Sequence, residues 1–173
     1  MNGGLNSKNM PEGNADIQID SLRYKNKTTH DISLFAEAFD DEAKIKVQSN
    51  DSALHLDLNG NFDLSEKNAY SGNLKGLFDV DLFGLNLLTE PFAGKGNIES
   101  NFFYSPKEIN ASLRLTDFTV QNKKEKVILE ETKFELNSSD SAIVSHLESD
   151  FLTANFDSKA SFADFKNAMH KIQ

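Results

Sequence analysis

The chain has 173 residues, with 27 acidic and 18 basic side chains and a formal net charge of -9. It contains no Cys and no Trp but 14 Phe. The lack of cysteine excludes disulfides, thiol nucleophiles and thiolate metal sites. The acidic balance argues against a nucleic-acid partner, because nucleic-acid-binding proteins present a basic face. A hydrophobic content of 38% excludes a disordered acidic chain, and no apolar stretch is long enough for a membrane-spanning helix.

The first segment, 1–14, is rich in Gly, Asn and Ser and has no periodicity, so we expect a leader without regular structure. From Ala15 onward, apolar and polar residues alternate, which is typical of half-buried strands. The alternation predicts strands over Ala15–Leu22, Ile32–Phe39, Ala43–Gln48, Leu54–Leu64, Ala69–Phe83, Phe92–Tyr104, Ile109–Leu115, Phe118–Gln121, Val127–Leu136, Ser141–Leu147 and Thr153–Phe162.

Short polar clusters such as 40–42, 65–68 and 105–108 separate the runs, and tight turns between sequential strands indicate antiparallel pairing. The strand segment therefore covers 15–162. In the last segment, 163–173, Phe165, Met169 and Ile172 recur at helical spacing and predict a short C-terminal helix.

Two features favour strong curvature of the sheet. Several runs are about twice the usual strand length. In addition, Gly72, Gly76, Gly94 and Gly96 fall on the apolar register, where the missing side chain lets a strand bend. We therefore predict an all-β fold in which long antiparallel strands form a strongly curved sheet, either a taco-like groove or a flattened barrel.

No motif in the sequence predicts catalysis, a cofactor or a metal. The spacing Asp57, Asn59, Asn61, Asp63 resembles the start of a calcium-binding loop, but Phe62 stands where that loop needs Gly. The same spacing is that of the outward face of a strand. The four histidines are scattered, and the paired acids fall in turns or on outward faces, so we expect a protein that is not an enzyme.

The apolar face remains as the candidate site, and we expect it to hold acyl chains. Its lining is predicted to be Leu54, Leu56, Leu58, Leu74, Phe78, Val80, Leu82, Phe92, Ile98, Phe102, Leu113 and Leu115. The alternative is that these side chains form only an ordinary protein core.

The residue pattern of several runs resembles the repeat segments of Bacteroidetes-type members of the TamB/AsmA-like superfamily of bacterial envelope proteins. TamB is part of the translocation and assembly module. The resembling runs are Leu54–Leu64, Ser71–Leu82, Gly94–Ser100 and Ser149–Ser158.

This resemblance implies a non-enzymatic internal segment of a large periplasmic protein that is anchored in the inner membrane. Its apolar groove would conduct or shelter phospholipid acyl chains between the membranes during outer-membrane biogenesis. The implied partners are phospholipid, the neighbouring β-repeats of the parent protein and an outer-membrane barrel protein.

Two other functions are compatible with the residue pattern. One is a self-contained carrier, a closed barrel with a finite cavity for lipid or another small molecule. The other is a structural β-module that takes no ligand.

Overall fold

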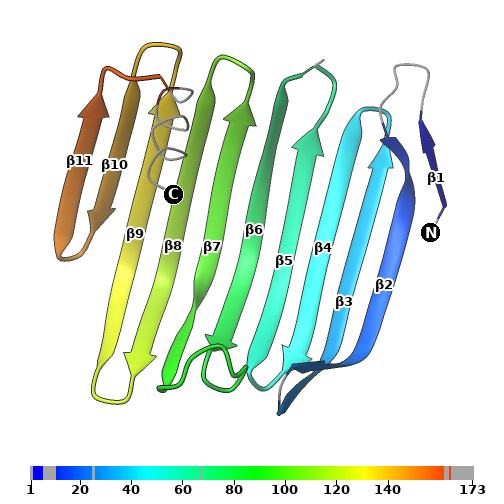
Figure 1. Ribbon diagram of the computed structural model, residues 1–173, viewed down its shortest axis with the longest axis vertical. Helices are drawn as coiled ribbons and strands as arrows, with labels where there is room; N and C mark the ends of the chain where they lie inside the picture. The colour runs from blue at the N-terminus through cyan, green and yellow to red at the C-terminus, as the bar shows by residue number, and fades with distance from the viewer. Residues whose placement is uncertain (1, 6–10, 25, 67, 162–163, 165–173) are drawn as a thin grey trace.

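The computed structural model describes residues 2–5, 11–24, 26–66, 68–161 and 164. Within them, eleven strands form one antiparallel sheet, and their order across the sheet is their order along the chain (Figure 1). The prediction of an all-β antiparallel fold is therefore confirmed.

The strands alternate in direction, so successive turns lie at opposite ends of the sheet (Figure 1). They are β1 (Asn2–Leu5), β2 (Pro11–Tyr24), β3 (Lys27–Phe39), β4 (Glu42–Asp51), β5 (Leu54–Asp63), β6 (Tyr70–Asp81), β7 (Phe92–Tyr104), β8 (Ile109–Asn122), β9 (Lys126–Ser138), β10 (Ile143–Ser149) and β11 (Leu152–Ser158).

The two terminal segments differ in how they compare with the predictions. The prediction of a leader without regular structure is wrong for Asn2–Leu5 and for the residues from Pro11 to Asn14. These two stretches pair with each other in β1 and β2. This pairing is made by backbone hydrogen bonds and needs no alternation of apolar and polar residues, so the sequence pattern did not predict it. The helix expected over 163–173 lies outside the described residues, apart from Asp164.

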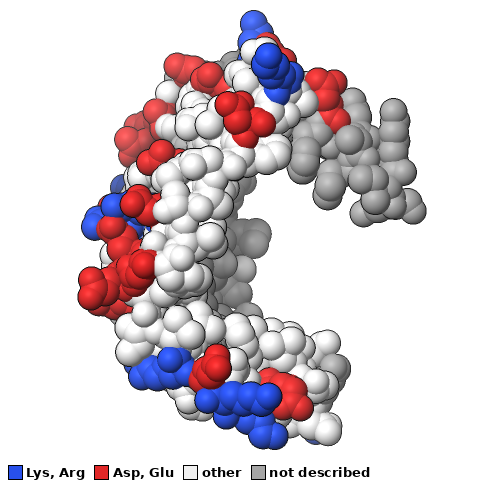
Figure 2. Space-filling model, turned by 90° about the vertical axis from the view of Figure 1, so that its left-hand side faces the viewer, with Lys and Arg blue, Asp and Glu red and all other residues white. Residues whose placement is uncertain are grey.

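The sheet bends along the length of its strands. In the view of Figure 2 the molecule has the shape of a C, with the charged side chains on its outer side and uncharged residues along its hollow side. This view looks across the strands from the β11 side, so the hollow is a groove that crosses one strand after another.

The sheet is not closed. β1 and β11 each pair with a single neighbour among the described strands. The flattened barrel that we considered is therefore wrong, and so is the closed cavity of a barrel carrier. Closure would need the first and last strands to meet. Bending along the strands does not bring them together.

Local backbone features account for the turns and bends. The β3–β4 hairpin has a two-residue loop, Asp40 and Asp41, with φ of 49° and 66°, the combination that matches the twist of paired strands. In β8, Asp117 has φ 51° and forms a β-bulge: Asp117 and Phe118 together face Gly96 of β7. The bulge moves the apolar register from odd positions such as Leu115 to even positions such as Phe118.

Candidate functional site

The hollow side of the sheet is lined by residues that the strand register aligns in rows. Residues paired directly across antiparallel strands point to the same side of the sheet. From β2 to β11 a first row contains Ile17, Leu34, Val47, Leu58, Gly76, Ile98, Leu115, Thr132, Ser149 and Leu152. None of these residues is charged.

Two further rows run beside the first. One contains Ala15, Ala36, Ile45, Gly60, Leu74, Ser100, Leu113, Phe134, Leu147 and Ala154. The other contains Gly13, Ala38, Ala43, Phe62, Gly72, Phe102, Ala111, Leu136, Ser145 and Phe156. We call the three together the apolar rows. Each crosses ten strands, roughly 43 Å at ~4.8 Å per strand, without a charged side chain.

The structure brings most of the predicted lining residues together on this face. Six of them lie in the apolar rows: Leu58, Leu74, Ile98, Phe102, Leu113 and Leu115. Leu56 and Phe78 are paired with each other one register step away, on the same face. Leu54 and Val80 are paired with each other on the same face. Leu82 and Phe92 lie at the end of the groove, where the backbone N–H of Leu82 donates to the carbonyl of Phe92 at 2.9 Å.

This face is not covered as a protein core would be. Of the predicted lining residues, Phe92 is exposed and all the others are only half-buried. In the described part of the chain, the buried apolar side chains are Ala69, Leu129 and Ile143. The groove therefore presents a large apolar surface to its surroundings.

Phenylalanine and glycine alternate across the groove. Phe62 of β5 and Phe102 of β7 have ring centroids 5.9 Å apart, and the residue between them on β6 is Gly72. Phe78 and Phe118 approach in the same way, with centroids 6.1 Å apart, across Gly96 of β7. The glycines leave room for rings from the strands on either side.

Near β3 the groove is lined by smaller side chains. A hollow of about 570 Å³ lies against Gly13, Ala15, Ala36, Ala38 and Ala43, and Glu12, Glu37 and Lys44 also border it. Because alanine methyl groups barely project from a sheet, the side chains fill little of the groove at this point.

Several lining residues escaped sequence reasoning. They include Ile17, Leu34 and Val47 on the weaker early runs and Phe118, Phe134 and Leu136 after the bulge. Strict alternation breaks at Asp117 and again at Glu130 and Glu131. Allowing one bulge at those positions would have extended the apolar pattern across β8 and β9.

The outer face carries the charges and the polar contacts. Arg114 Nε donates to Glu131 Oε1 at 2.6 Å, and Lys133 pairs with the same carboxylate. These two cations hold the pKa of Glu131 below its usual value, and Lys133 has the larger effect. His146 Nδ1 lies 2.6 Å from Asn155 Oδ1 on the neighbouring strand. Such contacts are those of a solvated sheet face.

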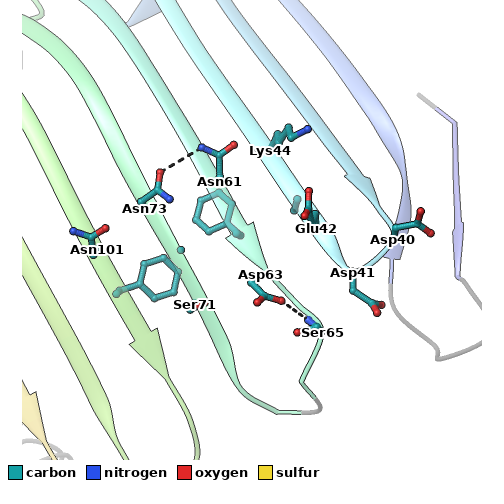
Figure 3. A pocket seen from close by; sticks show the side chains of 14 residues that line it. Asp40, Asp41, Glu42, Lys44, Asn61, Asp63, Ser65, Ser71, Asn73 and Asn101 are labelled. Atoms are coloured by element: carbon teal, nitrogen blue, oxygen red, sulfur yellow. Dashed lines mark hydrogen bonds between the residues drawn. The ribbon is translucent and has the colours of Figure 1, made fainter.

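A hollow of about 640 Å³ lies near the β3–β4 turn (Figure 3). Around it, Asn61 Nδ2 donates to Asn73 Oδ1 at 3.3 Å, and Asp63 Oδ1 accepts from the Ser65 N–H at 2.8 Å. Hydrogen bonds from Ser65 hold the pKa of Asp63 below its usual value. Asp40, Asp41 and Glu42 also line the hollow, yet no group of three His, Cys, Asp or Glu residues in the described part is arranged to hold a metal ion.

Comparisons with family models, curated proteins and solved structures each find no match to this chain. Among the described residues there is also no helix with the length and apolar character to cross a bilayer.

Proposed function

We propose that the apolar rows form a groove for the acyl chains of phospholipid. The observation that carries this proposal is the combination of length, absence of charge and exposure: three rows cross ten strands, and their side chains stay at most half-buried. A polar, water-soluble ligand would require hydrogen-bonding groups at this surface, whereas an acyl chain requires only apolar surface area.

The energetics of such binding are favourable. Burying a methylene group contributes about 0.8 kcal/mol, so a chain of about sixteen carbons with half of its surface covered gains roughly 6 kcal/mol. The rows are about 43 Å long at ~4.8 Å per strand, whereas one leaflet of acyl chains occupies roughly 15 Å. The groove has room for more than one chain, placed end to end.

In this proposal the chain is an internal, non-enzymatic segment of a periplasmic protein similar to the TamB/AsmA-like superfamily. The resemblance of its runs supports this, as do the open edges at β1 and β11, where neighbouring β-repeats could add strands. The groove would then continue into those repeats and guide lipid between membranes.

The test uses native mass spectrometry of the purified chain together with lipid extraction of the same sample. We expect phospholipid to copurify and to be lost in Leu58→Asp, which places a charge in the first apolar row. The matched control is Asn59→Asp, which adds the same charge to the next residue, on the opposite face.

Circular dichroism shows whether both variants keep the strand content. If Leu58→Asp unfolds, the milder Leu58→Asn and the addition of phospholipid to delipidated protein decide the question. A folded wild-type chain that carries no lipid and takes up none would overturn the groove proposal and favour a structural β-module.

A further inference from the structure

The loop between β6 and β7 is unusually apolar for a surface turn. Residues 82–91 contain four leucines and Phe83, whereas turns are normally dominated by Gly, Pro, Asn, Asp and Ser. Leu87 is 58% exposed, and Phe83 and Leu88 are each 43% exposed. These three side chains therefore leave a large part of their apolar surface uncovered.

The backbone of this loop is folded on itself. The N–H of Leu87 donates to the Leu82 carbonyl at 2.9 Å, and the N–H of Leu85 donates to the Asp81 carbonyl at 2.9 Å. The Asp81 carboxylate accepts from the Gly84 N–H at 2.9 Å. With its own hydrogen bonds satisfied, the loop presents its apolar side chains outward in a defined arrangement.

The neighbouring turn adds positive charge. Phe92 at the start of β7 pairs with Asn122, so the β8–β9 turn lies next to the β6–β7 loop. This turn contains Lys123, Lys124 and Lys126, against Glu125 in the turn and Glu90 in the loop. We define the rim patch as Phe83, Leu87, Leu88, Lys123, Lys124 and Lys126.

The opposite ends of the strands have a different character. Their turns include the consecutive acids Asp40, Asp41 and Glu42. In Figure 2, several Lys and Arg side chains lie at the lower end of the C, together with acidic ones, and Figure 1 places the β6–β7 and β8–β9 connections at this end; the upper end shows mainly acidic side chains with some Lys or Arg. The β8–β9 turn, with three lysines against Glu125, is therefore locally basic on a chain of net charge -9.

We infer that the rim patch docks onto the surface of a phospholipid bilayer that contains anionic lipid. Exposed aliphatic and aromatic side chains beside lysines are the combination that binds such surfaces: the apolar groups enter the interface and the lysines meet the lipid phosphates. The opposite end of the sheet, with Asp40, Asp41 and Glu42, would then point away from the membrane.

The patch is continuous with the groove. Leu82 accepts the hydrogen bonds from Leu87 and Leu88 and lies opposite Phe92 at the end of the groove. Resting on the proposed function, this arrangement gives acyl chains an uncharged path from the bilayer into the apolar rows.

Flotation with vesicles of phosphatidylcholine and phosphatidylglycerol tests the inference. We expect the full chain to float with the vesicles at low salt and to be released at high salt, because screening weakens the lysine contacts. Replacing the three lysines by Gln should weaken binding roughly a hundredfold, at about fivefold for each lysine near an anionic surface.

The apolar part of the patch is tested by Leu87→Ser with Leu88→Ser, for which we expect at least about a tenfold loss of vesicle binding. The matched control is Phe39→Ser with Val144→Ser: these side chains are exposed by 61% and 43% but lie on the outer face at the opposite end of the sheet, outside the patch and the apolar rows. The control should float as the wild-type chain does.

The outcomes separate this inference from the groove proposal. Leu58→Asp should lose lipid uptake but still float, whereas the Leu87 and Leu88 variant should stop floating while delipidated protein still takes up fatty acid. A wild-type chain that does not float, or one that floats equally well with the patch altered, overturns the docking inference. So does a patch variant whose only effect, measured by light scattering, is on association between copies of the chain.

Discussion

The rings of Phe62 and Phe102 lie 5.9 Å apart although their strands, β5 and β7, are not neighbours. The contact exists because the intervening residue on β6 is Gly72. A Cβ atom there would lie 2.6 Å from Phe62 Cδ1 and 2.9 Å from Phe102 Cε1, as well as 2.8 Å from a backbone oxygen. The glycine is thus a requirement of the packing over it.

We therefore predict that Gly72→Val destabilises the chain by about 1–3 kcal/mol, because both rings must move. Urea unfolding followed by circular dichroism measures the change. The control is Gly94→Ala on the same face, where the nearest atoms would be 3.9 Å from the new Cβ. Equal losses in the two variants would show that the ring contact does not determine the sensitivity.

Gly76 is constrained by its backbone. Its φ is +154°, and an added Cβ would lie 1.9 Å from the carbonyl oxygen of Asp57 on the paired strand. Gly76→Ala should cost at least about 2 kcal/mol of unfolding free energy, because no side-chain movement relieves a backbone clash.

Gly60→Ala is the comparison for Gly76→Ala, measured in the same urea experiment. There the closest atoms belong to the far end of the Phe62 ring, at 3.0 Å and 3.1 Å, and the ring can shift. The prediction fails if Gly60→Ala proves as damaging as Gly76→Ala.

Ala36 offers a way to obstruct the groove without disturbing the fold. It lies in an apolar row between Ala15 and Ile45 and borders the hollow of about 570 Å³. Ala36→Phe should fold normally, because the ring enters open space, but should reduce phospholipid uptake measured by lipid extraction. Lys46→Phe adds the same ring to the outer face of β4, away from this hollow, and should leave uptake unchanged; a matching loss there would contradict the assigned face.

Acid sensitivity should arise in part from Asp51. Its pKa is lowered by the backbone N–H of Ala53, which donates to its carboxylate at 2.8 Å, and also by the N–H of His30 at 2.9 Å. A carboxyl whose pKa is lower in the folded state stabilises the fold above its unfolded pKa, about 3.9, and that stability is lost as the pH falls through the folded value.

Asp51→Asn should accordingly be less stable than the wild-type chain at pH 7, and the difference should shrink near pH 3. Urea midpoints at the two pH values measure this, with Asp79→Asn on the outer face of β6 as the control. A gap of the same size at both pH values would assign the effect of the substitution to packing.

The middle of the sheet could be predicted from the sequence because its alternation is uninterrupted. The predicted run Phe92–Tyr104 coincides with β7, and Ala69–Phe83 differs from β6 by one residue at its start and two at its end. Each of these strands has one apolar face and one mainly polar face, on which Leu77 and Phe103 are the large apolar residues, so the period of two is clear in the sequence.

The remainder depends on contacts that no local pattern contains. β1 is held by pairing with β2, and its residues carry no apolar alternation. In β8 the bulge at Asp117 divides one strand into what reads as two runs, Ile109–Leu115 and Phe118–Gln121. Whether the sheet closes depends on the direction in which it bends, which is a property of all the strands together.

The alternation of strand directions also fixes how such a sheet can change in length. Adding a single strand would reverse the direction of the edge strand. Adding a whole hairpin leaves that direction unchanged and adds one turn at each end of the strands. Insertion or loss of hairpins would therefore resize the hollow surface in increments of roughly 10 Å, at ~4.8 Å per strand. In each case, the turns that carry Leu87 and Lys123 would stay at one end of the strands, and the turn that carries Asp40 and Asp41 would stay at the other end.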